Sequence, residues 1–209
     1  MIVRYAIMEL LGTMFLTLAV AVTGDPMAIG LMLMLVVYLG GHISGGHYNP
    51  VVSFASWIRG GLSNEYLLSY SISQILGACI GLCFARYITD ISGFASGAAG
   101  DDLTPMLFEV ILSMAFILLV LTFSRVAPYK SSAISGVVTG LSLTALLAAG
   151  KGVAIVNPAL VLGGVICSML MGSGVMMDIK PLAMHVGGPL IGAAIAAWLY
   201  NYLNESGKR

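Results

Sequence analysis

The chain has 209 residues, of which 59% are hydrophobic and only 9% are charged. A soluble domain carries roughly 25% charged residues, so this composition excludes a soluble fold and indicates an integral membrane protein. The net charge is zero, which gives no electrostatic reason to expect nucleic-acid binding. The sequence offers no nucleophile–base pair, metal cluster or cofactor motif, and we therefore do not expect an enzyme.

Taken in chain order, six segments are predicted to be membrane-spanning helices, which need about 20 mostly apolar residues; the second is short if it ends at Gly41 and can run on toward Ile43. They are approximately Arg4–Val22, Met27–Gly41, Glu65–Ile88, Thr104–Phe123, Ser131–Ala149 and Leu182–Tyr202. The first could be mistaken for a signal peptide, because Arg4 precedes an apolar run. Glu9 interrupts that run and no clear cleavage site follows, so we expect a mature first helix.

Two further apolar stretches, Pro50–Ile58 and Pro158–Met169, are too short to cross a bilayer. Each begins with proline directly after an asparagine, Asn49 or Asn157. Asparagine is a preferred N-cap, and proline is favoured at the first helical position. We therefore predict two half-helices, each entering the bilayer from one side and ending near its middle.

The elements divide into two halves, each with three spans and one half-helix. We place the first repeat at about 1–88, the connecting loop at about 89–103 and the second repeat at about 104–203, within one domain of residues 1–209. An odd number of spans inverts the second repeat, so the half-helices come from opposite faces and meet. The sequence therefore predicts an all-α membrane fold with six spans, two re-entrant half-helices and an inverted repeat.

Orientation follows from lysine and arginine, which are enriched in cytoplasmic loops. With a cytoplasmic N-terminus, six such residues lie inside and three outside. The inner ones are Arg4, Arg59, Arg125, Lys130, Lys208 and Arg209, and the outer ones are Arg86, Lys151 and Lys180. We therefore expect both termini to be cytoplasmic, in a plasma-membrane protein.

Asn49 and Asn157 are the residues that we expect to determine which solutes pass. The N-terminus of a half-helix has free N–H groups and a partial positive charge. Two such ends facing each other form an electropositive point, where the asparagine amides offer N–H donors to a passing oxygen. This arrangement admits uncharged solutes and opposes protons and cations. The alternative, an ordinary helix start, does not explain two copies half a chain apart.

The motifs around these asparagines resemble those of the aquaporin and aquaglyceroporin channels, the major intrinsic protein family. The resemblance is carried by residues 9–13, 41–52, 157–159 and 188–193. It implies the six-span fold, a passive channel without a cofactor or bound metal, and a homotetramer embedded in membrane lipids with one pore per subunit. The matching pore motif is Asn49, Pro50 and Val51, with Asn157, Pro158 and Ala159.

The same resemblance implies that Glu9 and Glu109, two acids inside apolar spans, each brace a re-entrant loop. Such residues are rare in membrane helices and usually face the protein interior. The alternatives are a carboxylate near the membrane surface and a proton relay. A relay would suit an ion-coupled transporter, the principal competing class of function; a non-conducting scaffold is a third, disfavoured by the short loops.

His47, Gly45 and Gly46 match family positions that line the cytoplasmic half of the pore. Alternatives for His47 are simple loop packing and a pH gate, because histidine changes charge near neutrality. We expect His42 to pack against or brace the loop. His185, at the start of the sixth span, receives no functional role.

The sequence departs from the family at the outer selectivity filter, where an arginine usually follows the second motif. That position is Leu160, and the other filter positions match Ile29, Leu147 and Ala154. All four are aliphatic, which removes a donor and a positive barrier and hinders water in a narrow pore. The alternative to a water channel is therefore a channel mainly for glycerol-like solutes, ammonia, hydrogen peroxide or gases. Lys151 is either a displaced positive charge or a solvated loop residue.

Small residues and cysteines remain. The pairs Gly77–Gly81, Gly136–Gly140 and Gly188–Gly192 allow close helix contacts, which we expect to lie within the monomer. Cys79, Cys83 and Cys167 lack zinc-site spacing. We expect them to be small packing residues, with a bridge or a metal site as the alternative.

Overall fold

The computed structural model of the chain describes residues 2–89, 102–125, 132–172 and 179–205. This part of the chain is all helical. Its elements are α1 Ile2–Thr23, α2 Pro26–Ser44, α3 Pro50–Ile58, α4 Asn64–Thr89, α5 Thr104–Arg125, α6 Ser132–Gly150, α7 Pro158–Leu170 and α8 Ile179–Glu205. They coincide with the predicted spans and half-helices within a few residues. The predicted connecting loop at 89–103 lies almost entirely outside the described residues.

Five of the described helices, α1, α2, α4, α5 and α8, are long and apolar enough to cross a membrane. The apolar stretch of α6, Ile134–Gly150, is somewhat shorter. The whole of α6 has 19 residues, as many as α2, and at 1.5 Å per residue it rises about 28 Å. That length approaches the ~30 Å hydrocarbon core, so α6 completes the set of six spans, the fifth in chain order.

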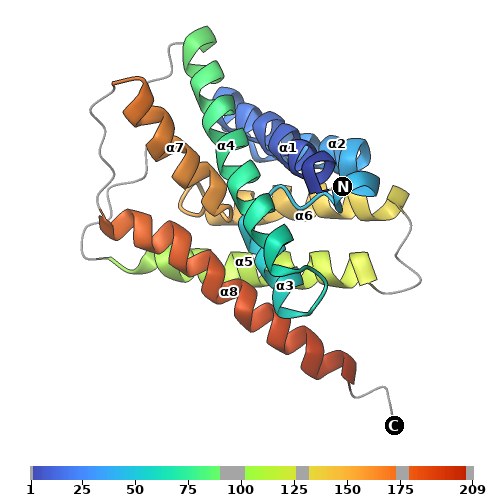
Figure 1. The fold of residues 1–209 in the computed structure, drawn as a ribbon. Coiled ribbons are helices and arrows are strands. Elements are labelled where there is room, and N and C mark those ends of the chain that lie inside the picture. Colours follow the sequence, from blue (N-terminus) through green and yellow to red (C-terminus); the bar gives the residue numbers. More distant parts are fainter. Residues whose placement is uncertain (1, 90–101, 126–131, 173–178, 206–209) are drawn as a thin grey trace.

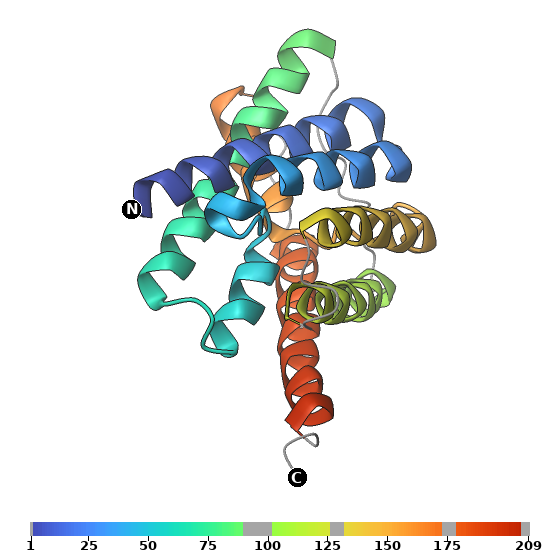
Figure 2. The same cartoon turned by 90° about the vertical axis from the view of Figure 1, so that its right-hand side faces the viewer.

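The helices pair in the same way in both halves. α1 packs along α4, and α5 packs along α8, as Figures 1 and 2 show. Glycines allow these contacts: a side-chain carbon at Gly77 would collide with the backbone oxygen of Leu10, and one at Gly192 with that of Val110. The predicted glycine pairs therefore do pack helices within the monomer.

The two halves are joined where α2 crosses α6. A side-chain carbon on Gly30 would collide with the backbone oxygen of Gly140, and the converse also holds. The cysteines lie at another contact, between α4 and α7, where the sulfurs of Cys83 and Cys167 are 2.6 Å apart. All three cysteines are free thiols, and within the described residues no metal-binding cluster includes them.

The half-helices α3 and α7 run from the centre of the molecule in opposite directions (Figure 1). They have 9 and 13 residues. Asn49 and Asn157 are their N-caps, with extended backbones and side-chain oxygens that accept the N–H of Val51 at 2.9 Å and of Ala159 at 3.1 Å. Both half-helices therefore begin at the predicted residue, with proline in the first turn.

Candidate pore at the meeting point of the half-helices

The two N-caps are bonded to each other's loops. Asn49 Nδ2 donates to the backbone oxygen of Val156 at 2.7 Å, and Asn157 Nδ2 donates to that of Tyr48 at 3.0 Å. An amide nitrogen carries two hydrogens, so this crossed pair uses one donor of each asparagine. The sequence predicts asparagine donors that point into the pore, but in the structure the opposite loop takes one hydrogen of each amide, and only the second remains for a solute.

The residue before each asparagine has a left-handed backbone, with φ 49° at Tyr48 and φ 58° at Val156. This backbone conformation is uncommon for residues other than glycine and costs of order 1–3 kcal/mol. It turns successive backbone N–H groups toward one side of the loop. A strong acceptor on that side is needed to hold the conformation, and each half supplies one.

In the first half that acceptor is Glu9 of α1, which is fully buried. Its Oε1 accepts from the backbone N–H of His47 at 3.0 Å and from Ser44 Oγ at 2.6 Å. Its Oε2 accepts from the backbone N–H of Tyr48 at 2.6 Å and from Gln74 Nε2 at 2.8 Å. The carboxylate thus fixes the loop that leads into α3.

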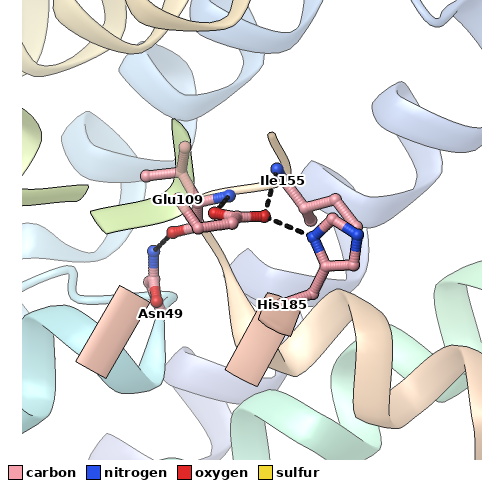
Figure 3. A network of polar contacts seen from close by, with 5 residues as sticks. Asn49, Glu109, Ile155 and His185 are labelled. Carbon is pink, nitrogen blue, oxygen red and sulfur yellow. Dashed lines mark hydrogen bonds and ion pairs between the residues drawn. The ribbon is translucent and has the colours of Figure 1, made fainter. Parts of the chain in front are cut away.

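In the second half the acceptor is Glu109 of α5, also fully buried. Its Oε1 accepts from the N–H of Ile155 at 2.7 Å and its Oε2 from the N–H of Val156 at 2.9 Å. Figure 3 shows both bonds and a third contact, from Oε1 to His185 Nδ1 at 2.7 Å. The burial of both carboxylates argues against the alternative of an acid near the membrane surface.

Two cavities lie near the crossed asparagines and share part of their lining. The larger, of about 910 Å³, is lined by the Gly45–His47 loop, by Tyr70 and by the ends of α2 and α5. The smaller, of about 310 Å³, is lined by both asparagines and by residues from α1, α2, α6, α7 and α8. Leu33, His47 and Phe116 line both. Among the described residues, no lysine, arginine, aspartate or glutamate lines either cavity.

The structure brings the four aliphatic filter residues together. Ile29, Leu147, Ala154 and Leu160 all line the small cavity. Lys151 is exposed at the turn after α6 and is not among the residues that line it. The wall of the small cavity therefore lacks the positive charge that an arginine at position 160 would give.

The glycines and histidines of the first loop lie beside the large cavity, which Gly45, Gly46 and His47 line. His47 Nδ1 is 3.0 Å from Ser53 Oγ, and its ring meets the edge of Tyr70. The expectation that His42 packs against the loop is not met, because it is exposed at the end of α2 and lines the large cavity.

Sequence reasoning missed two partners of the carboxylates, Gln74 and His185. Gln74 also reaches Ser53 Oγ, at 3.1 Å, and His185 lines the small cavity. One signal could have found them: a buried acid needs donors, and each of the two is a polar side chain within a membrane span. Alignment of residues 74–78 with 189–193 would also pair His185 with Tyr70.

Comparisons with known proteins agree with this geometry. The sequence profile described as Major intrinsic protein matches residues 8–200. A probable aquaporin, AqpM, of Archaeoglobus fulgidus is 29% identical over 86% of this chain and 77% of its own length. Aquaporin-8 of Notomys alexis is 36% identical over 66% of this chain and 56% of its own length. The crystal structure of the aquaglyceroporin from Plasmodium falciparum superposes with a TM-score of 0.79 over 96% of both chains, at 23% identity.

The chain therefore belongs to the major intrinsic protein family, with the aquaporin fold of six spans and two re-entrant half-helices. Members of this family are passive channels and not enzymes. The protein is a membrane-embedded channel for water or small solutes.

Proposed function

We propose that the two cavities form one pore and that this pore conducts water and other small uncharged solutes while it excludes ions. The crossed asparagine pair carries the proposal, because two half-helix N-caps are bonded across the molecule and both line the small cavity. Three residues, Leu33, His47 and Phe116, line both cavities, which supports a continuous pore.

Ion exclusion has two sources in this proposal. The N-terminal ends of α3 and α7 place partial positive charge at the centre of the pore, which opposes hydronium and metal cations. The lining lacks lysine, arginine, aspartate and glutamate among the described residues, so an ion receives no counter-charge for its lost hydration. Glu9 and Glu109 act as braces that hold the half-helices in register, and the His47 loop offers carbonyl acceptors along one cavity.

The aliphatic small cavity favours a second candidate within the same class. A wall of Ile29, Leu147, Ala154 and Leu160 gives few hydrogen bonds to a permeant, and polar solutes lose most when they leave water. The alternative is thus a channel mainly for glycerol-like solutes, ammonia, hydrogen peroxide or gases, with poor water flux.

In the membrane we propose cytoplasmic termini, which put the large cavity on the cytoplasmic side of a plasma membrane. Large apolar side chains on the helices that cross, such as Leu35, Leu68 and Ile80, are exposed and would contact lipid or neighbouring subunits. We propose a homotetramer with one pore per subunit, by analogy with the family. Cross-linking in native membranes tests the subunit number, and protease accessibility of tagged termini tests the orientation.

The permeant is decided by reconstitution. Vesicle volume is followed by stopped-flow light scattering under a sucrose gradient and then under a glycerol gradient. Fast shrinkage in sucrose supports a water channel, whereas slow shrinkage with fast glycerol re-swelling supports the second candidate. Folded protein that passes neither of these, nor ammonia or peroxide, would contradict the proposed function.

A further inference from the structure

His185 lines the small cavity, and its ring is tethered to a buried carboxylate. The side chain is almost fully buried on α8, and its Nδ1 lies 2.7 Å from Glu109 Oε1. It lines the small cavity together with the four aliphatic filter residues. Figure 3 shows the second ring nitrogen, Nε2, pointing away from Glu109.

The tether determines which nitrogen carries the proton. Both oxygens of Glu109 already accept backbone N–H groups, of Ile155 and Val156, as an ionised carboxylate does. An ionised carboxylate can only accept, so His185 Nδ1 must be the donor in this contact. In the neutral imidazole the other nitrogen is then unprotonated. In its neutral form His185, which lines the small cavity, therefore carries an Nε2 lone pair, which is a hydrogen-bond acceptor.

The first half offers a useful contrast. Tyr70 holds the equivalent place on α4, four residues before Gln74, while His185 lies four residues before Pro189. The Tyr70 hydroxyl donates to the backbone oxygen of Ser44 at 2.6 Å, so its donor is already used. Within the described residues, the contact with Glu109 is the one hydrogen bond of the His185 ring. Its Nε2 is thus available to a permeant.

We infer that His185 is a specificity-determining residue of the pore, whose Nε2 accepts a hydrogen bond from small neutral solutes that carry O–H or N–H groups. Water, ammonia and small polyols belong to this class. A solute that crosses an aliphatic wall loses hydrogen bonds to water, and His185 replaces one of them only for a solute that can donate. This role rests on the proposed channel function. An acceptor at this wall is the opposite of the arginine usual in the family, which can only donate hydrogen bonds.

The acceptor can be tested without transport. The chain contains three histidines, so ¹⁵N-histidine labelling of the whole protein gives few ring signals, and His185→Asn assigns those of His185. At mildly alkaline pH we expect protonated Nδ1 and unprotonated Nε2, with the Nε2 signal moving as glycerol is added. A protonated Nε2, or an Nε2 signal that does not respond to glycerol, would overturn the inference whether or not the protein conducts.

Two variants then separate selectivity from bracing. His185→Phe keeps an aromatic ring, a larger one, and removes both nitrogens, so water permeability per channel should fall at least roughly two- to tenfold, the worth of one hydrogen bond. His185→Asn keeps a donor near the Nδ1 position for Glu109 but lacks Nε2. We expect it to retain the wild-type melting temperature while its glycerol-to-water permeability ratio shifts by at least about threefold.

The outcomes are distinct. If His185→Asn keeps the wild-type ratio and only His185→Phe changes, with a loss of stability, His185 is a brace for Glu109 and the inference is wrong. If His185→Phe does not fold, His185→Asn and the nitrogen signals still decide. If the wild-type protein conducts none of the tested solutes, the proposed function fails, and the response of Nε2 to glycerol still judges the acceptor.

Discussion

Glu9 and Glu109 occupy equivalent places in the two halves, and each binds two successive N–H groups before an asparagine. They differ in what completes their hydrogen bonds. Glu9 takes Ser44 and Gln74, whereas Glu109 takes His185, which lines the small cavity. The two carboxylates thus hold their loops with the same geometry, and the halves differ in the side chains that complete the hydrogen bonds. In the second half that side chain, His185, is also part of the wall of the small cavity.

The largest expected effect comes from removing a brace. Glu9→Ala would leave four donors without their acceptor, and Glu109→Ala three. Each unsatisfied buried donor costs ~1–3 kcal/mol, so we expect a loss on the order of 3 kcal/mol or more, greater for Glu9→Ala. Thermal unfolding in detergent measures it, with Glu9→Gln as the isosteric control. Equal melting temperatures for wild type and Glu9→Ala would refute the bracing role.

Reversing the amide donors comes next. Asn49→Asp places a carboxylate oxygen against the backbone oxygen of Val156, and Asn157→Asp does the same at Tyr48. We expect each variant either to admit cations, because the central field is weakened, or to lose folded protein. Ion flux into vesicles loaded with a cation-sensitive dye is the measurement, and Pro50→Ala, which keeps both amides, is the control. Ion-tight, fully folded Asp variants would contradict the exclusion mechanism.

An arginine placed at position 160, where the family usually has one, tests the aliphatic lining of the small cavity. Leu160→Arg puts a donor and a charge into the aliphatic small cavity, which Leu160 lines while only 3% exposed. We expect the water-to-glycerol permeability ratio to change by at least about threefold, the effect of roughly one hydrogen bond. Leu160→Met keeps the volume without the charge and should leave the ratio close to wild type. No change with normal expression would place the constriction elsewhere.

A smaller effect is expected at the first-half counterpart of His185. Tyr70→Phe deletes the hydroxyl that bonds the backbone oxygen of Ser44. The free energy of unfolding should fall by about 1 kcal/mol, the net worth of one hydrogen bond, with little change in selectivity. Melting temperature and the glycerol-to-water ratio are measured together. A selectivity shift as large as that of His185→Phe would mean that the two positions act alike.

The smallest effect is expected at Lys151, an exposed residue of the turn before α7. Lys151→Ala should change stability by no more than about 0.5 kcal/mol and leave solute permeability unaltered. The same stopped-flow assay at low salt, where surface charge is least screened, gives the strictest test. A clear change there would revive Lys151 as a displaced filter charge.

Most of the fold could be predicted because its signals are local. Apolar length identifies the spans, and an asparagine followed by proline marks each half-helix start, so α3 and α7 begin where predicted. The inverted pairing of the halves also follows from counting elements. The filter and loop residues remain predictions in their roles, although the structure gathers the four filter candidates around one cavity.

What could not be predicted depends on contacts between distant residues. His185 and Glu109 are 76 residues apart, and Gln74 and Glu9 are 65 apart. A single histidine or glutamine in a membrane helix forms no repeating pattern in the sequence that would identify its partner. The crossed bonds of the asparagines were missed for the same reason: the sequence places the two N-caps face to face but does not show that each amide donates to the other loop.

Those crossed bonds also bear on biosynthesis. Asn49 is secured by the backbone of Val156, 107 residues later, and chains are made from the N-terminus onward. The ribosome therefore delivers α3 to the membrane long before the residue that fixes its N-cap exists. During synthesis the first re-entrant loop is held only by contacts within the first half, Glu9 foremost, and the pore is completed when the second loop is made.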